Sequence, residues 1–174
     1  NQNGVTIDKA SIVKMPYQTL DALLKQMPGL DIRTRGMNGV QSDISIDGGT
    51  FDQCLILLNG HPLSDPQTGH NLLTLPIGTL GIESIQIIKG PVASLYGVNA
   101  LSGIINIITS TKNPEQLVQV SVGTGALSSN TDSFYANFGL QLRSNIQLGK
   151  VSNTVHLGYD QGNGYRPNTA YKIL

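Results

Sequence analysis

The chain has 174 residues, of which 39% are hydrophobic and 13% charged, and its 11 basic and 11 acidic side chains give a formal net charge of zero. This balance, with only 5% aromatic residues, argues against a nucleic-acid-binding surface, because a positive field supplies most of that affinity. No stretch approaches the roughly 18 apolar residues of a membrane helix, so we expect any membrane contact to use β-structure. The sequence starts at Asn1 without a basic or apolar leader, and we expect that a signal peptide has been removed.

The N-terminal residues predict one short strand and one helix. Gly4–Asp8 alternates apolar and polar residues and is expected to be an edge strand. Thr19 is expected to cap a helix over Leu20–Met27, and Pro28-Gly29 to end it. The apolar side chains of this helix recur at i, i+3, i+4 and i+7, which predicts that one stripe faces a core. They are Leu20, Leu23, Leu24 and Met27.

Three further strands are predicted before residue 60. Leu30–Arg35 and Ser42–Asp47 alternate in the same way, whereas Gln53–Leu58 is almost continuously apolar and is expected to be buried on both faces. Asn59-Gly60 predicts a tight turn. His61–Leu75 is rich in proline and small polar residues, so we expect an exposed irregular loop.

The stretch Lys89–Thr109 reads K-G-P-V-A-S-L-Y-G-V-N-A-L-S-G-I-I-N-I-I-T. Pro91 presets φ for a helical turn over Val92–Tyr96, which Gly97 can end in the left-handed region. Ile104–Ile108 is a β-branched run with one polar interruption and predicts a buried strand. Upstream, Pro76–Leu80 predicts a short helical turn and Ser84–Ile88 a strand. Short strands and helices in mixed order indicate a small domain built on a mixed sheet.

After Pro114 a strict alternation replaces the helix signals. Apolar side chains share one face of each predicted strand, while polar residues and glycine occupy the other. The apolar positions are Val118, Val120, Val122, Phe134, Ala136, Phe138, Leu140, Leu142, Val155, Leu157 and Tyr159. This pattern fits the wall of a membrane β-barrel and a soluble β-sandwich equally well.

The sequence contains no pattern typical of a catalytic or metal site. Gly123-x-Gly125 lacks the third glycine of a dinucleotide-binding loop and predicts a hairpin loop instead. The three histidines are too scattered for a zinc site. Cys54 is the only cysteine, which excludes an internal disulfide, and its apolar neighbours predict a small buried side chain rather than a reactive thiol. We therefore expect no enzyme activity, no metal and no cofactor.

Four segments of the chain closely resemble the plug domain of TonB-dependent outer-membrane transporters. They are L-L-K-Q-M-P-G-L-D-I-R (Leu23–Arg33), I-L-L-N-G (Ile56–Gly60), I-E-S-I-Q-I-I-K-G-P (Ile82–Pro91) and the run ending at Thr109. The resemblance implies an α+β plug domain with a small mixed sheet over residues 1–112. Antiparallel transmembrane strands over 113–174 would then begin a barrel of about 22 strands, which is incomplete in this chain.

The resemblance also implies a function and a place. Such a protein lies in the outer membrane of a Gram-negative bacterium, with the plug in the barrel lumen, and takes up a large scarce nutrient with energy from the partner protein TonB. Alternatives are a siderophore or oligosaccharide receptor, and a soluble plug-like module that binds a ligand or protein without transport. The chain most resembles vitamin B12 receptors of the Bacteroides type, which implies cobalamin as the substrate.

Two loops are the predicted substrate contacts, since the corresponding loops touch substrate in the family. Their amide, hydroxyl and charged groups suit a large ligand with many polar groups. The predicted contact residues are Arg35, Met37, Asn38, Val40, Gln41, Ser64, Asp65, Gln67, Thr68, His70 and Asn71.

The sequence departs from the family pattern at three places. Asp47 stands where the family usually has arginine before glycine, and Ser84 replaces a usual basic residue. The family's arginines commonly face acidic groups on the barrel wall, so Asp47 puts that contact in doubt. No TonB-binding segment is recognisable before Val5.

Overall fold

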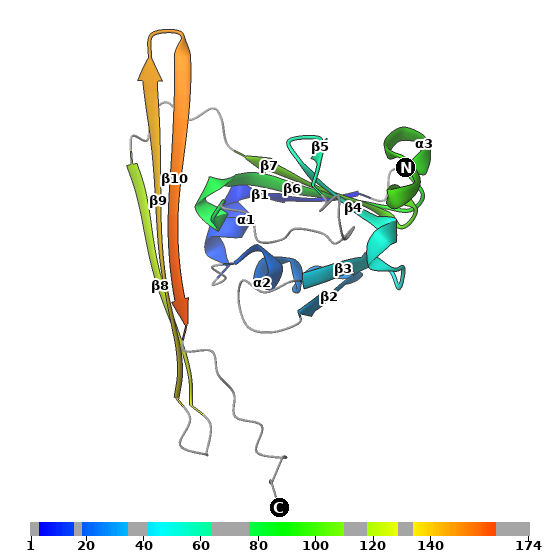
Figure 1. The fold of residues 1–174 in the computed structure, drawn as a ribbon, viewed down its shortest axis with the longest axis horizontal. Helices are drawn as coiled ribbons and strands as arrows, with labels where there is room; N and C mark the ends of the chain where they lie inside the picture. Colours follow the sequence, from blue (N-terminus) through cyan, green and yellow to red (C-terminus); the bar gives the residue numbers. More distant parts are fainter. Residues whose placement is uncertain are drawn as a thin grey trace, which may run out of the picture.

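The described residues form two β-structures: a plug part, in which a mixed sheet lies beside short helices and a two-stranded ladder, and a group of three long strands (Figure 1). The computed structural model describes residues 4–15, 19–34, 42–63, 77–109, 118–128 and 134–162. Figure 1 shows the long strands standing along one side of the mixed sheet.

The elements up to residue 109 are short. The strands are β1 (Gly4–Asp8), β2 (Leu30–Thr34), β3 (Ser42–Ile46), β4 (Cys54–Leu58), β5 (His61–Pro62), β6 (Ile82–Lys89) and β7 (Gly103–Thr109). The helices are α1 (Lys9–Lys14), α2 (Leu20–Leu24) and α3 (Ala93–Tyr96), with single 3-10 turns η1 (Phe51–Gln53), η2 (Thr79–Gly81) and η3 (Val98–Ala100). The long strands are β8 (Val118–Ser128), β9 (Phe134–Leu148) and β10 (Val151–Gly162).

The mixed sheet has five strands in the order β1-β6-β7-β4-β5, and β2 pairs separately with β3. Strand β4 runs parallel to β7, whereas β1, β6 and β5 pair antiparallel with their neighbours. Ile105 at the centre of β7 lies between Ile56 of β4 and Ile87 of β6. The predicted edge position of β1 is confirmed.

The mixed sheet is buried on both faces. One face packs against α1, α2 and the β2–β3 pair, in a core that includes Ile12, Leu23 and Ile44. The other face carries a smaller cluster formed by Leu55, Leu57, Ala100 and Ile104. Burial on both sides explains why β4 and β7 read as continuous apolar runs.

The N-terminal helices differ from the sequence prediction. Helix α1 was not predicted; Asp8 caps it by accepting a hydrogen bond from the Ser11 N–H at 2.9 Å. Helix α2 ends at Leu24 rather than Met27, and the Thr19 side chain makes no cap bond. Its predicted stripe is confirmed, because Leu20, Leu23 and Leu24 are buried and Met27 packs against them. In the described ranges, no helix has the length and apolar character to cross a membrane.

The predicted loop after β4 begins differently from expectation. His61–Pro62 forms a short strand that pairs with Leu57 and Leu58, because Asn59 and Gly60 both adopt positive φ, 51° and 83°, and reverse the chain in two residues. The predicted Asn59-Gly60 turn is therefore confirmed, the expectation of an irregular loop is wrong at His61–Pro62, and the predicted loop from residue 64 on lies outside the described residues.

The three long strands form an antiparallel sheet in the order β8-β9-β10, of 11, 15 and 12 residues. The predicted alternation is confirmed. Val120 and Leu157 are 60% and 62% exposed on the face away from the mixed sheet. Gln141 and Arg143, on the opposite face of β9, are 8% and 2% exposed.

Candidate functional site

The predicted substrate contacts fall in two segments, 35–41 and 64–76, that lie outside the described residues. They stay predictions. They are Arg35, Met37, Asn38, Val40, Gln41, Ser64, Asp65, Gln67, Thr68, His70 and Asn71.

The described residues that flank these segments belong to the β2–β3 ladder, to the segment after β5 and to the main core. Thr34 and Ser42 form the last pair of the β2–β3 ladder, at the two ends of the first segment. Leu63 precedes the second segment and donates its N–H to the Ile56 carbonyl at 2.8 Å. Ile77 follows the segment and packs against the main core. Both segments are thus held at each end by the plug sheet or its core, as is common for binding loops on a rigid scaffold.

The Asn59-Gly60 turn is fastened to the end of β7. The Asn59 N–H donates to the Ile107 carbonyl at 2.9 Å, and its side chain accepts from the Thr109 N–H and donates to Thr109 Oγ1, both at 2.9 Å. The Gly60 N–H donates to Asn106 Oδ1 at 3.0 Å. The L-N-G and I-N-I-I-T motifs therefore complete one hydrogen-bonded unit that closes this end of the sheet.

The closing run after β6 folds back on itself. The Gly90 N–H donates to the Ser102 carbonyl at 2.8 Å, and the Val92 N–H donates to the Ala100 carbonyl at 3.1 Å. Gly103, with φ of 150°, lies so close to the Ile88 carbonyl that a Cβ would collide with it. Gly97 has φ of 92° but ψ of 179°, so the predicted left-handed helical conformation is wrong, although positive φ still favours glycine there.

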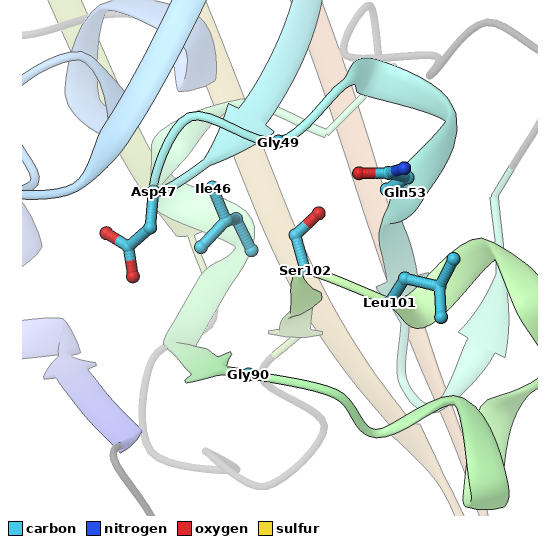
Figure 2. Close-up of a pocket in the computed structure, with 7 residues that line it drawn as sticks. All are labelled: Ile46, Asp47, Gly49, Gln53, Gly90, Leu101 and Ser102. Carbon is cyan, nitrogen blue, oxygen red and sulfur yellow. The ribbon is translucent and has the colours of Figure 1, made fainter.

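A small pocket lies between this run and the turn after β3 (Figure 2). Its volume is about 250 Å³, and it is lined by Ile46, Asp47, Gly49, Gln53, Gly90, Leu101 and Ser102. The Ser102 hydroxyl is buried and has no hydrogen-bond partner among the described residues. Sites for drug-sized ligands have about 300–1,000 Å³, so this pocket is too small for a large nutrient.

Asp47 and Lys89 form an ion pair beside a tight turn. Lys89 Nζ lies 2.9 Å from Asp47 Oδ1, and the Asp47 N–H donates to the Gly29 carbonyl at 2.9 Å. Gly29 has φ of 79°, and a Cβ there would collide with both charged groups. Asp47 stands at the position where the family usually has arginine. Its carboxylate therefore pairs with Lys89 inside the plug. Ser84, the other departure, lies between Asp8 of β1 and Ile108 of β7.

Sequence reasoning missed the partners that join the two β-structures. The alternation placed Gln141 and Arg143 on the polar face of β9, but gave no indication of what they touch. In the structure both bind the backbone of Leu80, in η2. Lys89 was also missed as the partner of Asp47. Alternation along a strand shows which side chains share a face. It does not show which residues, distant in the sequence, that face contacts.

Cys54 is buried in β4 and free, as predicted. Burial raises the pKa of its thiol to about 12, so the reactive thiolate is scarce at neutral pH. Among the residues that the structure describes, no cluster of three or more His, Cys, Asp or Glu could hold a metal ion.

A family comparison matches residues 2–104 to the TonB-dependent Receptor Plug Domain. The vitamin B12 transporter BtuB of Vibrio vulnificus (strain CMCP6) is 32% identical over 120 residues, which cover 69% of this chain and 20% of that protein. The vitamin B12 transporter BtuB of Vibrio cholerae serotype O1 (strain ATCC 39541) is 30% identical over 161 residues, or 91% of this chain and 25% of that protein. The chain thus spans a fifth to a quarter of these relatives.

Solved structures agree with this match. The ferric enterobactin receptor PfeA (G324V) from Pseudomonas aeruginosa superposes with a TM-score of 0.71 at 25% identity, over 90% of this chain and 24% of that one. The ferric citrate transporter FecA has a TM-score of 0.72 at 17% identity, over 92% and 25%. The predicted fold class is confirmed, and the Bacteroides type stays a prediction. The chain belongs to the TonB-dependent receptors of the Gram-negative outer membrane, and residues 2–104 are their plug domain.

Proposed function

We propose that the chain is the plug and the first wall strands of an outer-membrane transporter for a large, scarce nutrient. Residues 1–112 form the plug and residues 113–174 begin the barrel. The observation that carries this proposal is the polarity of β8–β10. Their polar face packs against the plug at Arg143, whereas Val120 and Leu157 on the other face are exposed. Exposed apolar rows suit lipid and disfavour a soluble binding module.

Cobalamin is the substrate that we propose. The relatives that cover 69% and 91% of this chain at 32% and 30% identity are named vitamin B12 transporters. The pocket of about 250 Å³ beside Ser102 is too small for such a ligand. We assign recognition to the predicted loops 35–41 and 64–71, on the resemblance to the family.

Within those segments, polar side chains would bind the carboxamides of cobalamin and apolar ones would contact its ring. The protein itself carries out no chemical step on the substrate. TonB supplies the energy, through a segment that is not recognisable here. The assigned residues are Arg35, Met37, Asn38, Val40, Gln41, Ser64, Asp65, Gln67, Thr68, His70 and Asn71.

The test uses the full-length receptor in detergent and cyanocobalamin as the probe. Alanine at Arg35, Asn38, Gln67 and His70 together should weaken binding well over tenfold, because each lost hydrogen bond costs on the order of 1 kcal/mol. Asn99→Ala, which removes an exposed amide elsewhere on the plug, is the control and should bind normally. Equal affinity of the quadruple variant and the control would move recognition to the barrel loops.

A siderophore is the second candidate substrate. The solved structures similar to this chain include a ferric enterobactin receptor in complex with enterobactin, at 24% identity. The same receptor preparation should therefore be titrated with ferric enterobactin. If the receptor binds ferric enterobactin and not cyanocobalamin, the proposed substrate changes to a siderophore. The proposal that the protein is a transporter is then unaffected.

A further inference from the structure

The turn η2 of the plug touches the long strands. The N–H of Leu80 donates to Gln141 Oε1 at 3.5 Å, and its carbonyl accepts from Arg143 Nη1 at 3.4 Å. The same Nη1 donates to Gln119 Oε1 of β8 at 3.5 Å. Both backbone groups of one plug residue are thus bound by side chains more than sixty positions later in the chain.

The partners of η2 come from two adjacent rows across the strands. Gln119, Arg143 and His156 face one another in register on β8, β9 and β10. Gln141 lies in the next row on the same face, opposite Gly158 of β10. The turn therefore meets a surface built by all three strands, rather than a single side chain.

Two glycines allow this close approach. A Cβ on Gly78 would collide with the Gln141 side chain. A Cβ on Gly81 would lie 2.6 Å from His156 Cε1 and 2.6 Å from Ile77 Cγ2. Neither glycine has a positive φ, so the backbone conformation would accept alanine. The lack of space next to the strands is what requires glycine at these positions.

The Arg143 side chain is buried where η2 meets the strands. Arg143 is only 2% exposed, and a buried guanidinium is costly unless its N–H groups meet acceptors. The Leu80 carbonyl is one of those acceptors. When η2 leaves the strands, Arg143 loses that acceptor. The contact with η2 thus supplies one of the acceptors that the buried guanidinium needs.

We propose that η2 is the docking site of the plug on the barrel wall, and that Gln119, Gln141, Arg143 and His156 form the matching surface. In this contact a wall arginine, Arg143, donates to a plug carbonyl, that of Leu80. The contact fixes the position of the plug relative to the barrel wall. It rests on the proposed function, since it requires β8–β10 to be part of the wall.

Amide hydrogen exchange of the full-length receptor in detergent tests this docking site. Arg143→Met and Gly81→Ala should each speed exchange of the Leu80 and Gly81 amides about tenfold, the loss expected for a hydrogen bond to a charged group. Amides of β4 and β7 should keep their protection, because the plug core is untouched. Gly158→Ala is the matched control: it lies on the same wall face, and a Cβ there meets nothing within 4 Å.

Three results would overturn the docking site. One is unchanged exchange at η2 in both variants, and another is equally faster exchange throughout the plug, which would indicate general destabilisation. The third is the same effect from Gly158→Ala. Should Arg143→Met prevent barrel folding, judged by heat-modifiable gel mobility, Gly81→Ala decides alone. The readout needs no substrate, so a failure to bind cyanocobalamin would not affect it.

Discussion

The plug sheet and the three long strands bury opposite kinds of side chain. In β7, Ile104, Ile105 and Ile107 are at most 1% exposed, and both faces of the strand are covered by protein. In the wall, Leu157 is 62% exposed, whereas Arg143 is 2% exposed. The first sheet is apolar inside, and the second is apolar outside.

The two regions therefore differ in residue pattern, because β4 and β7 are continuous apolar runs and β8–β10 alternate. Period-two alternation marks the two faces of a strand but not which face is wet. In the plug, helices and the β2–β3 pair cover one face of the mixed sheet, and the smaller cluster around Ala100 covers the other. In the long strands, the polar face meets the plug and the apolar face is exposed, as expected if they belong to the proposed barrel wall. The contact at η2 and the exposure of the side chains together assign the two faces of the long strands.

The largest effect is expected in the plug core. Ile105→Ala should lower the free energy of unfolding by about 2–5 kcal/mol, because the cavity at the sheet centre cannot close. Urea denaturation of the receptor in detergent, followed by circular dichroism, measures the loss. Val120→Ala, at a 60% exposed position of β8, should change it by no more than about 0.5 kcal/mol. Equal losses at both positions would mean that the two sheets are buried alike.

A charge on the apolar face should separate lipid from water. Leu157 in β10 and Val13 in α1 are both 62% exposed. Leu157→Arg should cost about 2–4 kcal/mol if it lies near the bilayer midplane, whereas Val13→Arg should be neutral. Folding into lipid vesicles at increasing urea concentrations gives both values. A neutral Leu157→Arg would place this face of β10 in water.

A smaller effect is expected at the turn after α2. Gly29→Ala should cost about 1–2 kcal/mol, since an L-residue resists positive φ, and the added Cβ would disturb the Asp47–Lys89 ion pair. Gly158→Ala in the wall, where a Cβ is unopposed, should cost far less. Both are measured by urea denaturation in low and in 1 M salt. A loss at Gly29 that disappears in 1 M salt would mean that the exposed ion pair, not the backbone, was responsible.

The smallest effect at neutral pH concerns Cys54, which tests whether the plug interior is dry. Its thiol pKa is about 12 in the folded protein, against 9.0 for a free thiol. The unfolded chain therefore releases this proton first, and stability should fall as pH rises from about 9 toward 12. Cys54→Val should lack this part of the slope, so urea midpoints at pH 7 and 10 for both proteins isolate it. Identical slopes would show that water reaches β4.

Sequence predicted the fold best where local chemistry decides. The alternation of β8–β10, the apolar run of β7 and the Asn59-Gly60 turn each depend on neighbouring residues, and all three are confirmed. Helix α1 was missed because its six residues bury only Ile12, too few apolar positions to show a helical period.

The contacts of the candidate site could not be predicted in the same way. Arg143 and Leu80 are 63 residues apart, and Lys89 and Asp47 are 42 apart. Neither residue in a pair has a neighbour that indicates its partner, because the fold alone brings them together. The alternation did place Arg143 on the correct face of β9. A local pattern can predict the face of a strand, but not the residue that this face contacts.

The central position of β7 has a consequence for the order in which the protein forms. It pairs with β6 on one side and β4 on the other, yet it is the last strand of the five in the chain. Until Gly103–Thr109 is available, no backbone ladder of this sheet joins β1–β6 to β4–β5. Such high contact order slows folding, and the apolar edges of β4 and β6 stay open to aggregation meanwhile. A chain interrupted before Gly103 should therefore be a client of chaperones and proteases rather than a smaller folded plug.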